Sequence, residues 1–153
     1  MFQQVYGFTR LPFSKSIPTS DLFAAAGQKE LAARLTFLVR EQGFGLVTGE
    51  FGSGKSTAVR AFAAALDANR HLVIYLANPT TGISGLYREL LVSLGHRPPY
   101  AASRQVCAIR AAFDDLRATK RRAPLVVVDE AHLLTQPMLE QLRLLFSAQM
   151  DSQ

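Results

Sequence analysis

Apolar residues along the chain alternate between helical spacing and short unbroken runs. Helical spacing predicts a helix over 28–41, where the apolar residues recur at i, i+4, i+7 and i+8. It predicts another over 55–68, a third ending at Gly95, a fourth beginning near Ser103 and a last one over 137–150. Unbroken apolar runs predict strands at 44–48, 71–76 and 125–128. Strands that alternate with helices predict an α/β fold with a parallel sheet covered by helices.

The run at 125–128 is apolar throughout, as expected for a parallel strand covered on both faces. The run at 44–48 carries the same signal, and we expect it to be a buried strand. The stretch before residue 28 contains aromatic residues and prolines without periodicity, which predicts an extended arm or a set of turns over 1–27.

Composition fits one globular domain of 153 residues, of which 48% are hydrophobic. Cys107 is the single cysteine, so no intrachain disulfide is possible, and this agrees with a reducing compartment. No apolar run approaches the ~20 residues of a membrane helix, and the first residues lack the pattern of a secretory signal. We therefore expect a cytoplasmic protein without a membrane segment in this chain. The net charge of +5 makes nucleic acid a plausible partner.

A glycine-rich segment between the expected strand 44–48 and the helix that follows matches the pattern G-x-x-x-x-G-K-[ST] in full. Its residues are Gly49, Glu50, Phe51, Gly52, Ser53, Gly54, Lys55 and Ser56. Glycines let the backbone wrap closely around a polyphosphate, and the loop amides with the helix N-terminus attract its negative charge. Lys55 can reach the β- and γ-phosphates, the Ser56 hydroxyl can bind Mg²⁺, and Thr57 lies beside it near the α-phosphate.

Two acids follow the third expected strand, at the edge where open α/β sheets bind ligands. Asp129 would hold Mg²⁺, through water in part, because this ion keeps much of its hydration shell. Glu130 would orient and deprotonate an attacking water. A carboxylate in this position favours hydrolysis and argues against a P-loop kinase, which must exclude water.

The two motifs together, at 49–56 and 125–130, resemble the Walker A and Walker B motifs of AAA+ ATPases. More narrowly, the chain resembles the family of ExeA-type secretion ATPases, origin-recognition-like ATPases and transposon-associated ATPases. The residues that carry this are the Tyr6-Gly7-Phe8 to Pro12-Phe13 arm, G-L-V-T-G before the loop and D-E-A-H-L-L at 129–134. The resemblance implies a three-layer P-loop NTPase fold of the AAA+ type, with ATP and Mg²⁺ as cofactors. It also implies a homo-oligomer with ATP bound between subunits.

The resemblance further implies a sensor strand after the last expected helix, lying between the first and third strands. The chain stops at Gln153, where that strand would begin, so we expect a truncated domain. Residues 28–153 would then be a partial nucleotide-binding domain that is incomplete at its C-terminus. The first and third strands would face each other across a gap with unpaired backbone groups.

Three functions remain open on the sequence. The first hypothesis is an ATPase that assists DNA transactions such as transposition, with DNA and a transposase as partners. The alternatives are a secretion-pathway ATPase of the ExeA type and an ATP-binding fragment that does not hydrolyse its ligand.

Individual residues also keep two interpretations. By the resemblance, Phe8, Pro12 and Phe13 would pack near adenine, or else they only close the edge of the sheet. His132 would couple nucleotide state to a partner, or else it is a capping or packing residue. The basic residues at 117–122 would contact DNA phosphates, or else they form a solvated helix end.

Overall fold

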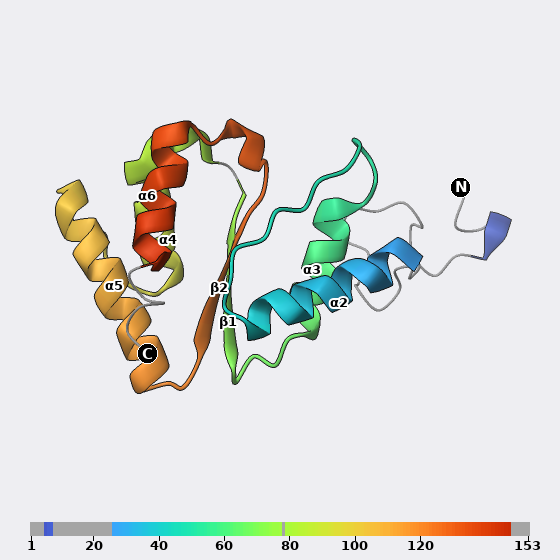
Figure 1. Cartoon of the computed structure of the whole chain (residues 1–153), viewed down its shortest axis with the longest axis horizontal. Coiled ribbons are helices and arrows are strands. Elements are labelled where there is room, and N and C mark those ends of the chain that lie inside the picture. Colours follow the sequence, from blue (N-terminus) through green and yellow to red (C-terminus); the bar gives the residue numbers. More distant parts are fainter. Residues whose placement is uncertain (1–4, 8–25, 78, 148–153) are drawn as a thin grey trace. The chain divides into compact units, whose positions relative to one another are not determined.

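The computed structural model describes residues 5–7, 26–77 and 79–147 of the chain. It divides into two compact units, Met1–Ala65 and Leu66–Gln153. The first unit carries helices α2 and α3, and the second carries a two-stranded sheet with helices α4, α5 and α6 (Figure 1). Each unit is described by itself below.

In the first unit, helix α2 (Ala26–Arg40) packs on helix α3 (Lys55–Ala65). The apolar stripe of α2 that begins at Leu31 is half-buried, and its opposite side carries an exposed ion pair between Arg34 and Glu30 at 2.6 Å. No side chain of residues 27–65 is fully buried. Residues 27–65 therefore form helices without a closed core among themselves.

The strand expected at 44–48 does not form. The structure assigns no strand there, and the side chains of Phe44 and Leu46 are 58% and 79% exposed. An apolar run becomes a parallel strand only when paired neighbours and covering helices bury it, and the described sheet consists of β1 and β2 alone. The prediction of a buried strand at this position was wrong, because apolar side chains alone do not specify whether a segment pairs with a sheet.

In the second unit, β1 (His71–Leu76) and β2 (Ala123–Val128) are parallel, with Ile74 opposite Val126. Between them the chain runs through a short 3₁₀ turn (Pro79–Thr81), α4 (Gly82–Ser93) and α5 (Ala102–Ala118). A second 3₁₀ turn (Ala131–Leu133) and α6 (Gln136–Ser147) follow β2.

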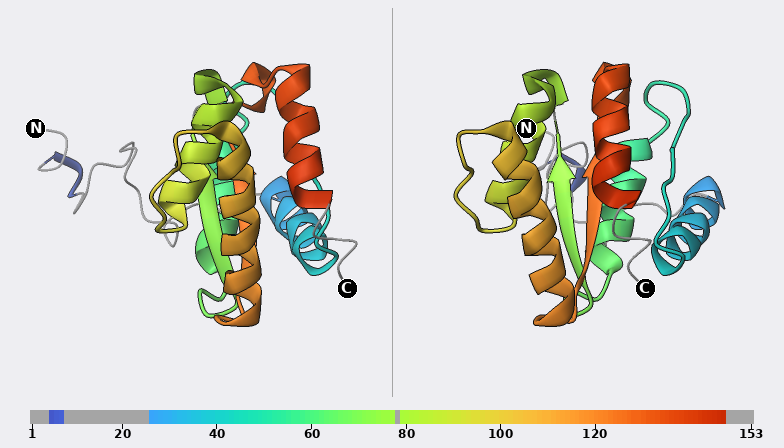
Figure 2. Two further views of the ribbon diagram at one scale, coloured as in Figure 1. Left: turned by 90° about the vertical axis from the view of Figure 1, so that its left-hand side faces the viewer. Right: turned by 60° about the vertical axis from the view of Figure 1, so that its left-hand side comes forward.

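The core of the second unit lies on one face of its sheet. Ile74 and Leu76 of β1 are buried, and Val126 and Val128 of β2 pack against the same cluster. Helices α4, α5 and α6 cover this face, as the two views of Figure 2 show. They contribute the remaining large buried side chains, which are Leu86, Tyr87, Leu90, Leu91, Ile109, Phe113, Met138, Leu142 and Leu145.

One polar side chain is fully buried within the described residues, that of Gln105 on α5. Its amide nitrogen donates to the carbonyl oxygen of Pro99 at 2.8 Å, and its amide oxygen accepts from the Ser84 hydroxyl at 3.2 Å. A buried amide with both ends satisfied fixes the chain around it, so Gln105 ties the 95–101 connection to α4 and α5.

Most of the predicted elements are confirmed, and so is the α/β class with a parallel sheet and helices against it. The strand at 71–76 has the predicted bounds, while β2 begins two residues earlier than expected. The three-layer arrangement and the division into an arm (1–27) and a nucleotide-binding domain (28–153) stay predictions. Phe8, Pro12 and Phe13 lie outside the described residues.

Candidate functional site

The glycine-rich loop at 49–56 is shaped by glycines in backbone conformations that other residues adopt with strain. Gly52 and Gly54 have φ of 78° and 82°. Between them the Ser53 amide donates to the carbonyl oxygen of Glu50 at 3.3 Å, which closes a tight turn. The Gly54 carbonyl then accepts the Ala58 amide at 2.8 Å, the first helical hydrogen bond of α3. The loop thus leads directly into a helix N-terminus, which is where anions bind.

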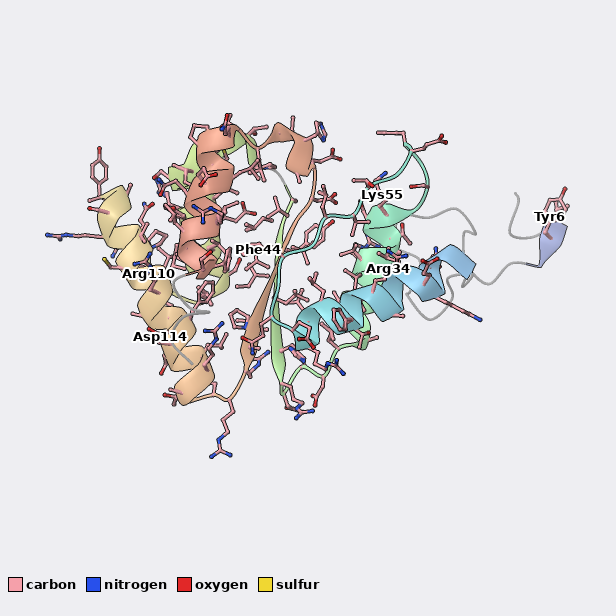
Figure 3. The ribbon with its side chains drawn as sticks, in the orientation of Figure 1. Tyr6, Arg34, Phe44, Lys55, Arg110 and Asp114 are labelled. Carbon is pink, nitrogen blue, oxygen red and sulfur yellow. The ribbon has the colours of Figure 1, made fainter. Side chains whose placement is uncertain are left out.

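Lys55 folds its side chain back into this loop. Its Nζ donates to the carbonyl oxygens of Gly49 at 2.9 Å and Glu50 at 2.7 Å. The Ser53 hydroxyl lies 3.5 Å from the same nitrogen. Figure 3 shows Lys55 at the start of α3, below the loop. The ammonium is held by backbone oxygens and by no carboxylate among the described residues, so its positive charge is not neutralised within the fold.

The remaining predicted loop residues lie around this lysine. Ser56 is exposed and Thr57 is half-buried in the first turn of α3. Phe51 is fully exposed at the tip of the loop. The structure therefore brings residues 49–57 together in one turn-and-helix start, and their contact with a nucleotide stays a prediction.

Asp129 continues β2 beyond its last assigned residue. Its amide donates to the carbonyl oxygen of Leu76 at 2.9 Å, which extends the parallel ladder by one bond. The Tyr75 hydroxyl donates to its Oδ2, and the amide of Glu130 donates to its Oδ1 at 3.0 Å. Both oxygens of this half-buried carboxylate are thus oriented, one by a donor from β1 and the other by the amide of the next residue in the chain.

Glu130 leaves the strand in the left-handed backbone region, with φ of 50° and ψ of 39°. Its carbonyl accepts the Leu133 amide at 2.9 Å, which starts the 3₁₀ turn of Ala131–Leu133. Its exposed carboxylate lies 3.4 Å from Nδ1 of His132. A strained non-glycine residue that points a carboxylate outwards is an arrangement found at functional sites.

His132 lies in the 3₁₀ turn that follows Glu130. Its side chain is 71% exposed and contacts Glu130. It does not pack in the core, and no side-chain cap is made at the start of the 3₁₀ turn that contains it.

The donor set at the end of β2 fits Mg²⁺. The described residues contain no cluster of three or more His, Cys, Asp or Glu side chains that could enclose a metal ion by themselves. Mg²⁺ does not need such a cage, because it is bound by one or two carboxylates together with phosphate oxygens and water. Asp129 would supply the carboxylate, and Ser56 the hydroxyl, of a site that the nucleotide completes.

Residues 49–57 belong to the first unit and Asp129 and Glu130 to the second. The structure brings each set together separately, and the joining of the two sets around one nucleotide stays a prediction.

The basic residues at 117–122 are partly engaged within the fold. Lys120 lies 3.8 Å from Asp115, and Arg122 donates to the carbonyl oxygen of His71 at 3.0 Å. These contacts agree with a helix end whose cations serve the fold, although they do not test binding to phosphates.

Comparison with known families decides the assignment of the chain. The profile described as "AAA domain" matches residues 39–153, which include both motifs. The chain belongs to the AAA domain family of P-loop ATPases. ATP binding and hydrolysis are the activities of AAA domains, and ATP with Mg²⁺ is the general ligand of the family. The family resemblance inferred from the sequence is thereby confirmed.

One curated relative of this AAA domain is "General secretion pathway protein A" of Aeromonas hydrophila. The two are 32% identical over 162 residues, which cover 99% of this chain and 28% of the relative. The chain thus spans just over a quarter of the length of that protein. No solved structure gives a significant match. These comparisons do not support the transposition hypothesis.

Helices of this AAA domain that lie in the described ranges are all too short or too polar to cross a bilayer.

Sequence reasoning missed one residue of the AAA domain that touches the candidate site, Tyr75. Its hydroxyl contacts Asp129 across 54 positions of sequence. The contact could be predicted only from the positions of the two residues in the sheet. Tyr75 lies opposite Val127, and Asp129 comes two residues after Val127. This diagonal neighbour can be found only when the register of the two strands is known.

Proposed function

We propose that this chain binds ATP in the loop at 49–56 and hydrolyses it with the help of Mg²⁺. The observation that carries the proposal is the hydrogen bonding of Lys55 to the loop carbonyls at a helix N-terminus. No carboxylate among the described residues pairs with this ammonium, and the negative charge of a polyphosphate would offset its positive charge. The family membership supports the same function.

In this proposal each residue has one role. Gly49, Glu50, Phe51, Gly52, Ser53 and Gly54 supply the backbone that surrounds the phosphates, and Thr57 lies near the α-phosphate. Lys55 contacts the β- and γ-phosphates, while Ser56 and Asp129 bind Mg²⁺. Glu130 accepts a proton from the attacking water.

We further propose that the process served is a secretion pathway and not transposition. The support is the secretion-pathway name of the relative that aligns along nearly the whole chain. A homo-oligomer with ATP between subunits is part of the proposal, as the family resemblance implies. DNA and a transposase remain the partners of the less supported hypothesis, for which the charge of +5 is the remaining argument.

Nucleotide binding is tested by titrating a fluorescent ATP analogue in the presence of Mg²⁺. Lys55→Ala should weaken binding about tenfold or more, because a hydrogen-bonded charge contact is worth about 1.5–3 kcal/mol. Lys120→Ala is the matched control, since it removes one positive charge from the turn that follows α5 in the second unit. Equal affinity of the wild type and Lys55→Ala would remove the loop as the binding site.

Hydrolysis is tested separately, by phosphate release. Glu130→Gln keeps the size of the side chain and removes the base, so turnover should fall by about 10²-fold or more while ATP still binds. Glu140→Gln on α6 is the control, because Glu140 is also exposed and pairs only with Arg143 among the contacts of the described residues. Wild-type turnover no faster than that of Glu130→Gln would leave a nucleotide-binding chain that is not an ATPase.

A further inference from the structure

The second face of the two-stranded sheet carries a polar pair, Tyr75 and Asp129, of which only Asp129 belongs to a family motif. On β1, Ile74 and Leu76 point into the core, so Tyr75 between them points to the opposite face. On β2, Val126 and Val128 pack against the core, and Asp129 follows on the opposite face. The two polar side chains therefore lie on one face, at the carboxyl end of both strands.

The register explains why they meet. Tyr75 pairs with Val127, and Asp129 is the diagonal neighbour two residues further along β2. Diagonal neighbours on one face are within reach of a long aromatic side chain. The Tyr75 hydroxyl accordingly donates to Oδ2 of Asp129. A phenylalanine could cover the same surface of the sheet, but it would leave this oxygen without the phenolic donor.

We propose that Tyr75 is a positioning residue for the metal ion, which acts by holding the carboxylate of Asp129. This inference rests on the proposed function, because it assumes that Asp129 binds the Mg²⁺ of the nucleotide. The Glu130 amide holds Oδ1 and the Tyr75 hydroxyl holds Oδ2, so rotation of the carboxylate is restrained at both oxygens. A carboxylate oxygen can accept more than one contact, so a donor on each oxygen does not by itself exclude a metal-bound water. Partners of this kind orient metal ligands, and their loss weakens metal binding.

The variant that tests this role is Tyr75→Phe, which removes one oxygen atom. Binding of Mn²⁺ in place of Mg²⁺, in the presence of ADP, is measured by electron paramagnetic resonance on the full chain. We expect the affinity for Mn²⁺ to fall about tenfold. Losses of this size are typical when a residue that hydrogen-bonds to a metal ligand is removed. Phosphate release should need a correspondingly higher Mg²⁺ concentration, and its rate at saturating Mg²⁺ should recover to within about twofold of wild type.

Tyr87→Phe is the matched control. Tyr87 is a second tyrosine of this unit, whose hydroxyl lies 3.4 Å from the amide oxygen of Gln141, and it belongs to the core on the opposite face. Its loss should leave the Mn²⁺ affinity unchanged. The circular-dichroism spectrum and thermal midpoint of each variant report whether the fold survives.

A second comparison separates positioning from a general effect on the fold. If Tyr75 acts through the carboxylate, Tyr75→Phe should have no further effect on Mn²⁺ affinity when Asp129 is already alanine. One outcome would overturn the role of Tyr75 and leave the proposed function intact. In it, folded Tyr75→Phe binds Mn²⁺ as tightly as the wild type, while Asp129→Ala loses Mn²⁺ binding. Absence of Mn²⁺-nucleotide binding in the wild type overturns the proposed function itself, and this inference with it.

Discussion

Arg121 and Glu130 stand at the two ends of β2 with the same left-handed backbone, at φ of 51° and 50°. Both are non-glycine residues, for which this conformation costs about 1–2 kcal/mol. At the start of the strand, the Arg122 amide that follows Arg121 returns to the carbonyl of Leu116 and closes α5. At its end, Glu130 carries the candidate base. The same backbone conformation therefore forms a turn at Arg121 and positions the candidate catalytic carboxylate at Glu130.

Replacement of Glu130 by glycine should separate stability from turnover. Glu130→Gly removes the strain, so the free energy of unfolding should rise by about 1 kcal/mol, while phosphate release should be lost. Chemical denaturation and phosphate release measure the two effects. Arg121→Gly is the control, which should give a similar gain in stability with unchanged turnover. A destabilised Glu130→Gly variant would show that this backbone is not strained.

Alanine at Gly52 should weaken nucleotide binding through the backbone alone. Gly52 has φ of 78°, and no atom lies within 4 Å of an added Cβ, so the change adds strain without a clash. We expect the loop to shift from this conformation, and affinity for the fluorescent ATP analogue to fall about tenfold, the equivalent of about 1.4 kcal/mol.

Gly95 is the matched position for that experiment. It has φ of 83°, equally open surroundings, and lies at the end of α4. Gly95→Ala should lower the free energy of unfolding of the second unit by about 1–2 kcal/mol and leave nucleotide affinity unchanged. Equal losses of affinity in both variants would point to a general effect of alanine at positive φ.

Truncation of Gln105 should destabilise the second unit. Gln105→Ala leaves the Pro99 carbonyl and the Ser84 hydroxyl without this partner, so we expect a loss of about 1–3 kcal/mol in the free energy of unfolding. Urea denaturation followed by circular dichroism measures it. Gln136→Ala, at the exposed start of α6, should change stability by no more than about 0.5 kcal/mol. A neutral Gln105→Ala would mean that this hydrogen-bonded link does not stabilise the fold.

Tyr87 makes the stability of the second unit sensitive to alkaline pH. Burial raises the pKa of the Tyr87 hydroxyl above its usual value of 10.0, and the charge of Arg110 offsets part of this effect. The folded state therefore keeps this proton at a pH where the unfolded chain releases it. The contribution to stability is complete below about pH 10 and is lost as the pH rises through the folded-state pKa.

Removing this hydroxyl should flatten the alkaline part of the stability curve. Tyr87→Phe should lose less free energy of unfolding than the wild type between about pH 8 and about pH 11, as measured by urea denaturation. Tyr100→Phe is the control, because Tyr100 is fully exposed. An identical slope for the wild type and Tyr87→Phe would contradict the assignment.

Local patterns predicted the elements whose neighbours are close in the chain or whose faces are buried. The β1 strand and the helix with Leu86 and Leu90 could be predicted because the apolar side chains that define their patterns are the ones buried in the core. The run at 44–48 has the same character but is exposed, and local sequence does not state whether a strand finds partners. The contact of Tyr75 with Asp129 depends on strand register, which a single sequence does not determine.

The loop that would receive the phosphates lies within residues 27–65, a described stretch without a fully buried side chain. A segment with so little apolar packing has a small free energy of local opening. A ligand that binds only the closed loop stabilises it against opening by the free energy of ligand binding. Nucleotide would then act as a structural component of the first unit, and amide protons around Gly52 and Lys55 would exchange slowly only while it is bound.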